Sequence, residues 1–152
     1  MVLHCKTFQL YEQARAYLAA GQGSNARPIL EQVSKDFTKS GKVEYAVEAQ
    51  IFLCQLEVDG GEYRAALQQL TNAKAVAHND GNTAAEIRLL LIEGNIYQIL
   101  RDVSKAYAAY NAARSLSVAF GNKQTELEAS LQLVKLEMKF AAGAVSFDEL
   151  QT

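Results

Sequence analysis

Apolar and small residues recur along this 152-residue chain at spacings of three and four, which places them on one face of a helix. The pattern is clearest from Gly94 to Ala113, where Tyr97, Ala106 and Tyr110 continue it on both sides of a polar break. Strong helix formers dominate the composition, there is one proline, and runs of β-branched residues are missing. We therefore predict an all-α chain.

Glycines and polar breaks divide this pattern at regular intervals. Gly41, Gly81 and Gly121 stand forty residues apart, and each follows a long helical stretch. Further breaks fall at 21–23, 59–61 and 100–102. A glycine just beyond a helix end adopts the left-handed cap conformation without steric cost, so we predict tight turns between helices. The predicted helices span 3–20, 24–39, 42–59, 62–79, 82–100, 102–119 and 122–141.

Two kinds of cap are available where these helices begin. Asn82 and Asn122 each follow a turn glycine, and an asparagine at that place accepts a hydrogen bond from the first helical turn. Alternatively, Thr83 with Glu86 three residues on forms a capping box. Both alternatives predict that a new helix starts directly after the glycine.

Two further residues test the helix boundaries. Pro28 is compatible with a helix that begins near residue 24 or 25, because the first turn has N–H groups without intrahelical partners. Ser146 with Glu149 resembles a capping box that opens an eighth helix near the end of the chain.

The expected packing positions align when the chain is shifted by forty residues. Each unit has small residues where two helices approach, and a large residue four positions after the second small one. These columns are Ala14, Cys54 and Gly94; Ala26, Ala66 and Ala106; Leu30, Leu70 and Tyr110; and Val33, Ala73 and Ala113. We predict one domain over 1–152, with repeats at about 3–40, 41–80 and 81–120 and a half repeat at 121–152.

These positions resemble the tetratricopeptide repeat (TPR), whose signature is W-x2-L-G-x2-Y, then A-x3-F, then a proline. The third unit supplies Gly94-x2-Tyr97 and Ala106-x3-Tyr110. The chain departs from the signature in its forty-residue period and in lacking the tryptophan, so it resembles a long-helix variant. The departures include Leu10, Gln50 and Leu90 at the tryptophan site, and Glu57 and Glu137 at the tyrosine site.

The resemblance implies a right-handed α-solenoid of antiparallel helix pairs, with about three and a half repeats and seven main helices. It also implies that the first helix of each repeat lines a concave groove. The partner-binding residues expected there are Tyr11, Arg15, Gln55, Arg88, Asn95, Gln98 and Lys135. Most are hydrogen-bond donors suited to the carbonyls or acidic side chains of an extended peptide. The alternative is that they are ordinary solvated positions on a helix surface.

Composition narrows the class of partner. The chain is 49% hydrophobic and 21% charged with a formal net charge of −2, whereas nucleic-acid binding usually requires a basic face. No apolar run approaches the ~20 residues that a membrane span requires. The first residues lack the layout of a signal peptide, and two widely spaced cysteines suit a reducing compartment. We expect a cytoplasmic protein, with the nucleus as the alternative.

Catalytic and cofactor chemistry is not indicated. His4, Cys5, Cys54 and His78 lack the spacing of metal ligands, and Cys54 occupies a small packing position. No glycine-rich phosphate loop is present. We expect neither metal nor cofactor, and predict a non-catalytic scaffold that binds a protein or peptide. The alternatives are a segment of a larger TPR assembly, self-association through the exposed C-terminal helix into a homo-oligomer, and a small-molecule or enzymatic role in the groove.

Overall fold

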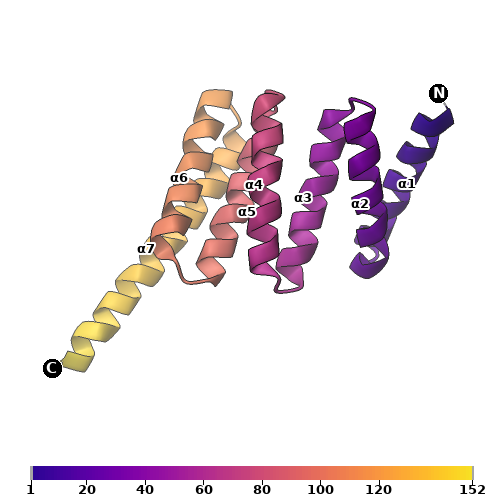
Figure 1. Ribbon diagram of the computed structural model, residues 1–152. Coiled ribbons are helices and arrows are strands. Elements are labelled where there is room, and N and C mark those ends of the chain that lie inside the picture. The colour runs from indigo at the N-terminus through magenta and orange to yellow at the C-terminus, as the bar shows by residue number, and fades with distance from the viewer. Residues whose placement is uncertain (1, 152) are drawn as a thin grey trace. The chain divides into compact units, whose positions relative to one another are not determined.

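The computed structural model describes residues 2–151, with side chains from Cys5 to Ala141, and that part of the chain forms seven α-helices and no strand (Figure 1). The helices are α1 (Val2–Ala19), α2 (Gly23–Lys39), α3 (Val43–Asp59), α4 (Tyr63–Asn79), α5 (Thr83–Ile99), α6 (Val103–Phe120) and α7 (Lys123–Gln151). The all-α class and the seven helices are confirmed. Both ends of the first six helices fall within one residue of the prediction.

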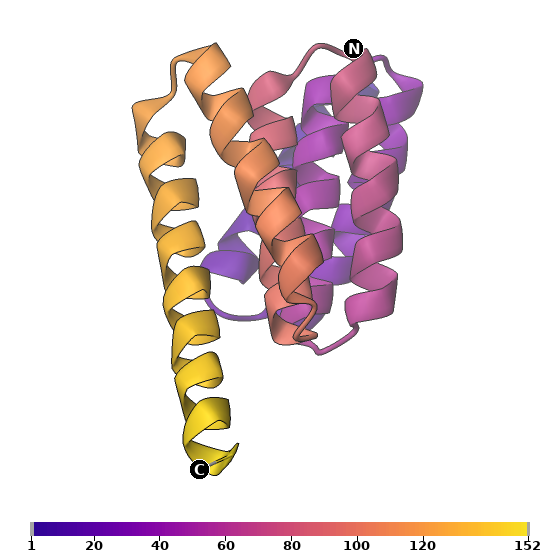
Figure 2. The same cartoon turned by 90° about the vertical axis from the view of Figure 1, so that its left-hand side faces the viewer.

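Contacts between Cα atoms divide the chain into two compact units, one up to Leu89 and one from Leu90 onward, with the boundary inside α5. In the first unit, α1, α2, α3 and α4 pack against one another in chain order (Figure 1). In the second unit, α6 packs along α7 (Figure 2). Consecutive helix packing is thus observed, while the single domain and the right-handed solenoid stay predictions.

The six turns between helices share one geometry and recur every twenty residues. Each contains one residue with a left-handed φ of 61–79°: Gly21, Gly41, Gly61, Gly81, Arg101 and Gly121. In the first turn, the Gly21 N–H donates to the Leu18 carbonyl at 3.0 Å and the Gln22 N–H to the Tyr17 carbonyl at 2.8 Å. The other five repeat this pair of bonds, which defines the Schellman motif. The predicted glycine turns are confirmed.

Side-chain capping differs between the earlier and the later turns. Asn82 Oδ1 accepts from the Ala85 N–H at 3.1 Å, and Asn122 Oδ1 accepts from the Thr125 N–H at 3.2 Å, so the asparagine alternative is confirmed. Asp102 caps α6 in the same way. The equivalent residues in the first three turns, Gln22, Lys42 and Glu62, make no side-chain cap hydrogen bond. These three turns therefore leave N-terminal N–H groups to solvent.

Pro28 lies deeper in its helix than predicted, and the predicted end of the last helix is wrong. α2 begins at Gly23, so Pro28 is its sixth residue, beyond the first turn, and deprives the Ser24 carbonyl of its helical partner. Ser24 is exposed, so water can take that place. α7 continues from Lys123 to Gln151, and no eighth helix begins near Ser146. Gly143 is tolerated within α7 because one glycine costs only about 1 kcal/mol relative to alanine in a helix.

The predicted packing columns form the core. Every member is buried, with at most 1% of its surface exposed where a value is given, and Gly94 belongs to the same buried class. The first unit adds an aromatic group in which Phe8, Tyr11, Phe37 and Tyr45 lie with ring centroids 4.8–6.1 Å apart. The helices thus pack through the aligned small and large positions that the forty-residue shift identifies.

Candidate functional site

Tyr11 and Arg15, two of the expected groove residues, contact each other on α1. The Tyr11 side chain is 6% exposed, and its ring lies 5.7 Å from the Phe37 ring, so it offers little surface to a partner. Burial raises the pKa of the Tyr11 hydroxyl, and the nearby Glu48 carboxylate raises it further. The Arg15 guanidinium lies 5.9 Å from the centre of the Tyr11 ring and 3.1 Å from Glu12 Oε1. Arg15 is the exposed member of this pair.

Gln55 and Arg88 are both engaged within the first unit. Gln55 Nε2 donates to Asp59 Oδ1 at 3.0 Å, one turn further along α3. Arg88 Nη1 donates to Glu48 Oε1 at 2.5 Å, and this ion pair joins equivalent positions of α3 and α5 that are forty residues apart. α3 and α5 therefore meet here at positions that match under the forty-residue shift.

Asn95 and Gln98 in the second unit are hydrogen-bonded to the hydroxyl of Tyr110. That hydroxyl lies 2.5 Å from Asn95 Oδ1 and 3.0 Å from Gln98 Oε1. It donates to one amide oxygen at a time, and the other amide can turn its NH₂ toward the phenol oxygen. Burial raises the pKa of Tyr110 to about 12, so the hydroxyl stays protonated. These two amides therefore hold a core side chain, a role that helix periodicity cannot indicate.

Lys135 is exposed on α7. Together with Arg15 it leaves two cationic side chains of the expected set with their charged groups facing solvent, one in each unit. The remaining members are buried or contact other side chains of this chain. Most of the seven residues expected to bind a partner therefore make contacts within the chain.

A cleft between α3 and α4 was missed by the sequence analysis. It has a volume of about 330 Å³ and is lined almost entirely by polar side chains. The lining residues are Gln50, Glu57, Ala65, Gln68, Gln69 and Asn72. Gln50 and Glu57 replace the tryptophan and tyrosine of the repeat signature. These two departures are the feature of the sequence that points to a polar cleft.

The same cleft recurs forty residues later, between α5 and α6, with a different lining. Its volume is about 260 Å³, and six of its residues are each shifted by forty from those of the polar cleft. They are Leu90, Tyr97, Lys105, Ala108, Ala109 and Ala112, joined by Glu93. Gln50 is thus replaced by leucine, Glu57 by tyrosine, and the amide side chains of α4 by alanines. Both clefts form at equivalent positions of the backbone. The earlier one is lined by amides and a carboxylate, and the later one mainly by apolar side chains, with Lys105 and Glu93 as its charged members.

The Glu57 carboxylate lies in an unfavourable environment inside the polar cleft. Its side chain is 13% exposed, and Oε1 lies 3.7 Å from the Arg27 guanidinium, an ion pair beyond hydrogen-bond length. Glu57 Oε2 and Gln50 Oε1 are buried and have no hydrogen-bond partner among the described residues. Burial raises the pKa of Glu57; Arg27 opposes that shift, and Glu31 and Glu62 add to it. The cleft therefore contains acceptors that lack donors.

No protein-family model matches this chain, and no curated protein matches it either. Within residues 2–151, none of the helices combines the length and hydropathy that crossing a bilayer requires. The described side chains include no group of three His, Cys, Asp or Glu placed to hold a metal ion. Both cysteines are free thiols, with Cys5 exposed and Cys54 buried. Cys54 is fully buried at its packing position, and burial raises the pKa of its thiol to about 12, which keeps the thiol protonated.

Proposed function

We propose that this chain is a non-catalytic TPR-like scaffold of the cytoplasm that binds a peptide or helical segment of a partner protein. The observation that carries the proposal is the register of the repeats. Turns of one geometry recur every twenty residues, and Glu48 pairs with Arg88 across forty. Stacked repeats bury a continuous core and leave long helical faces, which such proteins use for binding.

The proposed binding residues lie, in each unit, on the first helices of the repeats. Arg15 and Lys135 are the main cationic contacts, because both are exposed. Arg88 supplies a third, since its side chain remains 43% exposed beside Glu48. A segment with acidic side chains and free carbonyls complements these donors.

Affinity capture with three baits tests the proposal. The baits are the wild-type chain, a variant with Arg15→Ala and Lys135→Ala, and a control with Lys39→Ala and Lys139→Ala, which removes the same charge from two other exposed positions. The proposal predicts a protein captured by the wild type and the control and lost with the first variant. Identical recovery by all three baits and by an empty matrix contradicts it.

Self-association, or continuation into a longer array, is a second candidate function that one observation favours. α7 exposes Leu127, Leu131, Val134 and Met138 at helical spacing, each 51–69% exposed. Three residues forty positions earlier, Ile87, Leu91 and Gly94, are buried. α7 thus presents, without a partner among the described residues, a face that its equivalent in the preceding repeat keeps buried.

Light scattering separates this candidate from the scaffold. Self-association predicts a mass that rises with concentration for the wild type, and a monomer when Leu131 and Met138 are both changed to glutamate. A wild type that stays monomeric at high concentration contradicts self-association and leaves the scaffold proposal intact.

A further inference from the structure

The polar cleft between α3 and α4 is built differently from its equivalent one repeat later. Gln50 and Glu57 stand where Leu90 and Tyr97 stand forty residues on, while the helices around the two clefts differ in length by at most one residue. Burying polar atoms that lack partners is costly, so this lining lowers the stability of the second repeat unless something satisfies it. The next repeat avoids this loss of stability by using apolar side chains. We take the polar lining of the earlier cleft as a sign that it binds a ligand.

The acceptors of the cleft define the chemistry of the missing donor. Glu57 Oε2 and Gln50 Oε1 are both buried and unpaired among the described residues. Gln68, Gln69 and Asn72 on α4 add amide groups that can turn either their oxygen or their NH₂ toward a ligand. A ligand that donates several hydrogen bonds to a carboxylate and neighbouring amides therefore fits this lining.

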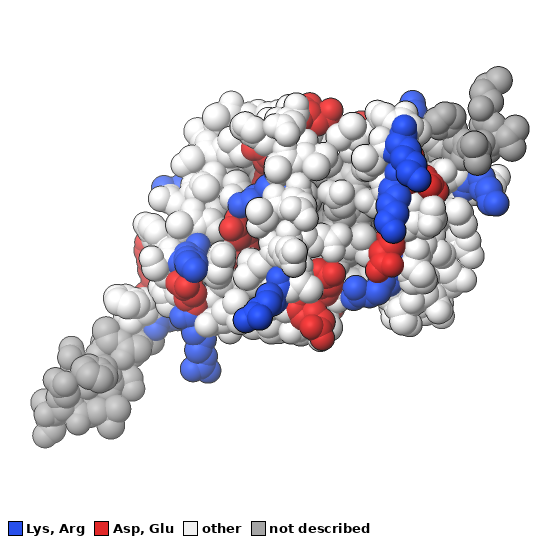
Figure 3. All heavy atoms as spheres, in the orientation of Figure 1, with Lys and Arg blue, Asp and Glu red and all other residues white. Residues whose placement is uncertain are grey.

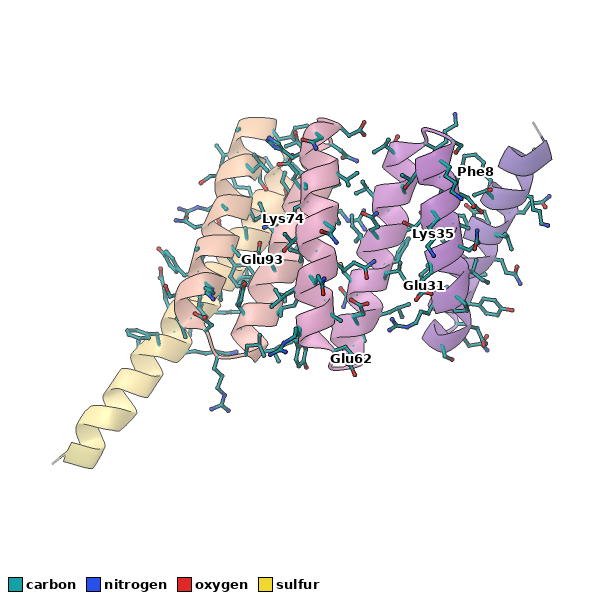
Figure 4. All side chains as sticks on the ribbon, in the orientation of Figure 1. Phe8, Glu31, Lys35, Glu62, Lys74 and Glu93 are labelled. Atoms are coloured by element: carbon teal, nitrogen blue, oxygen red, sulfur yellow. The ribbon has the colours of Figure 1, made fainter. Side chains whose placement is uncertain are left out.

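The charge of the surroundings selects a cation. Glu31 and Glu62 raise the pKa of the Glu57 carboxyl and Arg27 lowers it, so two further carboxylates and one guanidinium act on Glu57. Glu31 on α2 and Glu62 at the start of α4 are labelled on the same view of the first unit (Figure 4), and that view shows both acidic and basic side chains (Figure 3). Carboxylates thus outnumber cations among the groups that act on Glu57, although Arg27 already occupies one side of Glu57 at 3.7 Å.

The spacing of the two unpaired oxygens favours an extended ligand. Gln50 and Glu57 are seven residues apart on α3, which corresponds to about 10 Å along the helix axis. An extended peptide covers that distance in about three residues. Both oxygens are buried, so the Glu57 and Gln50 side chains must turn toward the cleft before an arginine side chain and a backbone N–H can satisfy them. The planar guanidinium suits a carboxylate flanked by amides better than a compact ammonium does.

We infer that this cleft binds an arginine side chain presented by an extended segment of a partner protein, with Glu57 as its carboxylate and Gln50 as the second acceptor. The inference rests on the proposed scaffold function, because the guanidinium belongs to another protein. The cleft would give the scaffold a second contact surface. Its carboxylate would bind a cationic group, whereas Arg15, Arg88 and Lys135 would bind acidic groups.

Blocked amino acids test the chemistry of the cleft directly. The ¹⁵N-labelled chain is titrated with N-acetyl-arginine N-methylamide, and the lysine and citrulline analogues serve as the ammonium and neutral controls. We expect saturable shifts at the amides of the cleft residues, none at Leu90 and Tyr97, weaker binding of the lysine analogue and none of the citrulline analogue. Absence of saturable shifts with the arginine probe, or equal binding of citrulline, overturns the inference.

Two variants keep the test independent of folding. Glu57→Gln keeps the shape of the side chain and removes its charge, and it should weaken arginine binding by about tenfold or more. The pair Gln50→Leu with Glu57→Tyr copies the lining of the next repeat and should abolish binding. Thermal unfolding should show both variants to be at least as stable as the wild type. Unchanged arginine binding by a folded Glu57→Gln variant overturns the assignment.

A crosslinking arm identifies the source of the guanidinium. p-Benzoylphenylalanine in place of the exposed Ala65, at the rim of the cleft, should crosslink to a polypeptide in cells, and the attached peptide should contain arginine. Binding of the blocked arginine without a crosslinked polypeptide would mean a free small molecule and overturns the partner assignment. If the arginine titration fails but a protein is captured in a manner that depends on Arg15 and Lys135, the arginine site in the cleft is rejected. The proposed scaffold function is then retained.

Discussion

Gly94 and Tyr110 are matched to each other across α5 and α6, because a Cβ on Gly94 would lie 2.4 Å from Cε1 of the Tyr110 ring. In the first two repeats the paired side chains differ less in size. The pairs are Ala14 with Leu30 and Cys54 with Leu70. The large ring in the third repeat therefore requires the smallest residue opposite it. Tyr110 is fully buried, so its ring has no room to move aside.

Gly94→Ala should destabilise the second unit by roughly 1–2 kcal/mol, since overpacking outweighs the helix propensity gained from alanine. Tyr110→Leu alone should also destabilise it, because a cavity opens and Asn95 and Gln98 lose the hydroxyl. The double variant copies the pairing of the first repeat. Denaturant unfolding should show a favourable coupling of about 1 kcal/mol or more in the double-mutant cycle, and strict additivity would contradict the matched fit.

Arg101→Gly should stabilise the chain by about 1 kcal/mol. Arg101 is the one turn residue among the six that carries a side chain at a left-handed φ, 61°, and glycine adopts that conformation without the steric cost. Neighbouring glycines provide the control. Gly61→Ala, at a φ of 79°, should destabilise by about 1 kcal/mol, whereas Gly60→Ala, in the right-handed helical region, should be neutral or stabilising. Melting temperatures that do not separate these two alanine variants would contradict this account of the turns.

Lys42→Asn should stabilise α3 by about 0.5–1 kcal/mol. Lys42 is the residue before α3 and makes no side-chain cap hydrogen bond, whereas Asn82 and Asn122 at the equivalent places accept one from the first turn. Asn82→Ala is the reciprocal change and should cost a similar amount. Chemical denaturation of both variants checks the pair, and an unchanged midpoint for Lys42→Asn would show that the turn cannot present the amide correctly.

Glu57→Gln should raise the stability of the first unit at neutral pH by on the order of 1 kcal/mol. The pKa of Glu57 is raised above 4.5 in the folded chain by burial, with Glu31 and Glu62 adding to the effect against Arg27. The folded state thus holds this proton more tightly than the unfolded state, so the stabilisation is present at pH values below 4.5 and is lost as the pH rises through the folded pKa. The advantage of glutamine should therefore shrink in acid. An advantage that is constant between pH 4 and 7 would exclude this carboxylate as its cause.

Most of the fold follows from the sequence because its determinants are local. Helix periodicity and the turn glycines fixed the first six helices to within one residue, and the small and large positions identified the core. The end of α7 does not follow from the sequence, because Gly143 interrupts a helix only weakly and the capping-box pattern at Ser146 lies inside the continuous helix.

The candidate sites were harder to predict because they depend on side chains meeting across helices. Asn95 and Gln98 occupy positions that look solvated, and only the placement of the Tyr110 hydroxyl reveals their internal role. The polar cleft requires two departures on α3 to be combined with the amides on α4. Gln50 and Glu57 depart from the repeat signature. A signature compares positions one at a time, however, so it does not show which side chains of different helices line one cleft.

The central claim is that this chain acts by binding another protein, and the mass and composition of the particle that contains it in its native cell test that claim most directly. The chain contributes 16.7 kDa, so gel filtration with light scattering and mass spectrometry can separate the outcomes. The account predicts a particle that contains a second, different polypeptide and loses it when Arg15 and Lys135 are changed to alanine. A particle composed only of this chain, as a monomer or as a whole-number multiple of 16.7 kDa, would contradict it.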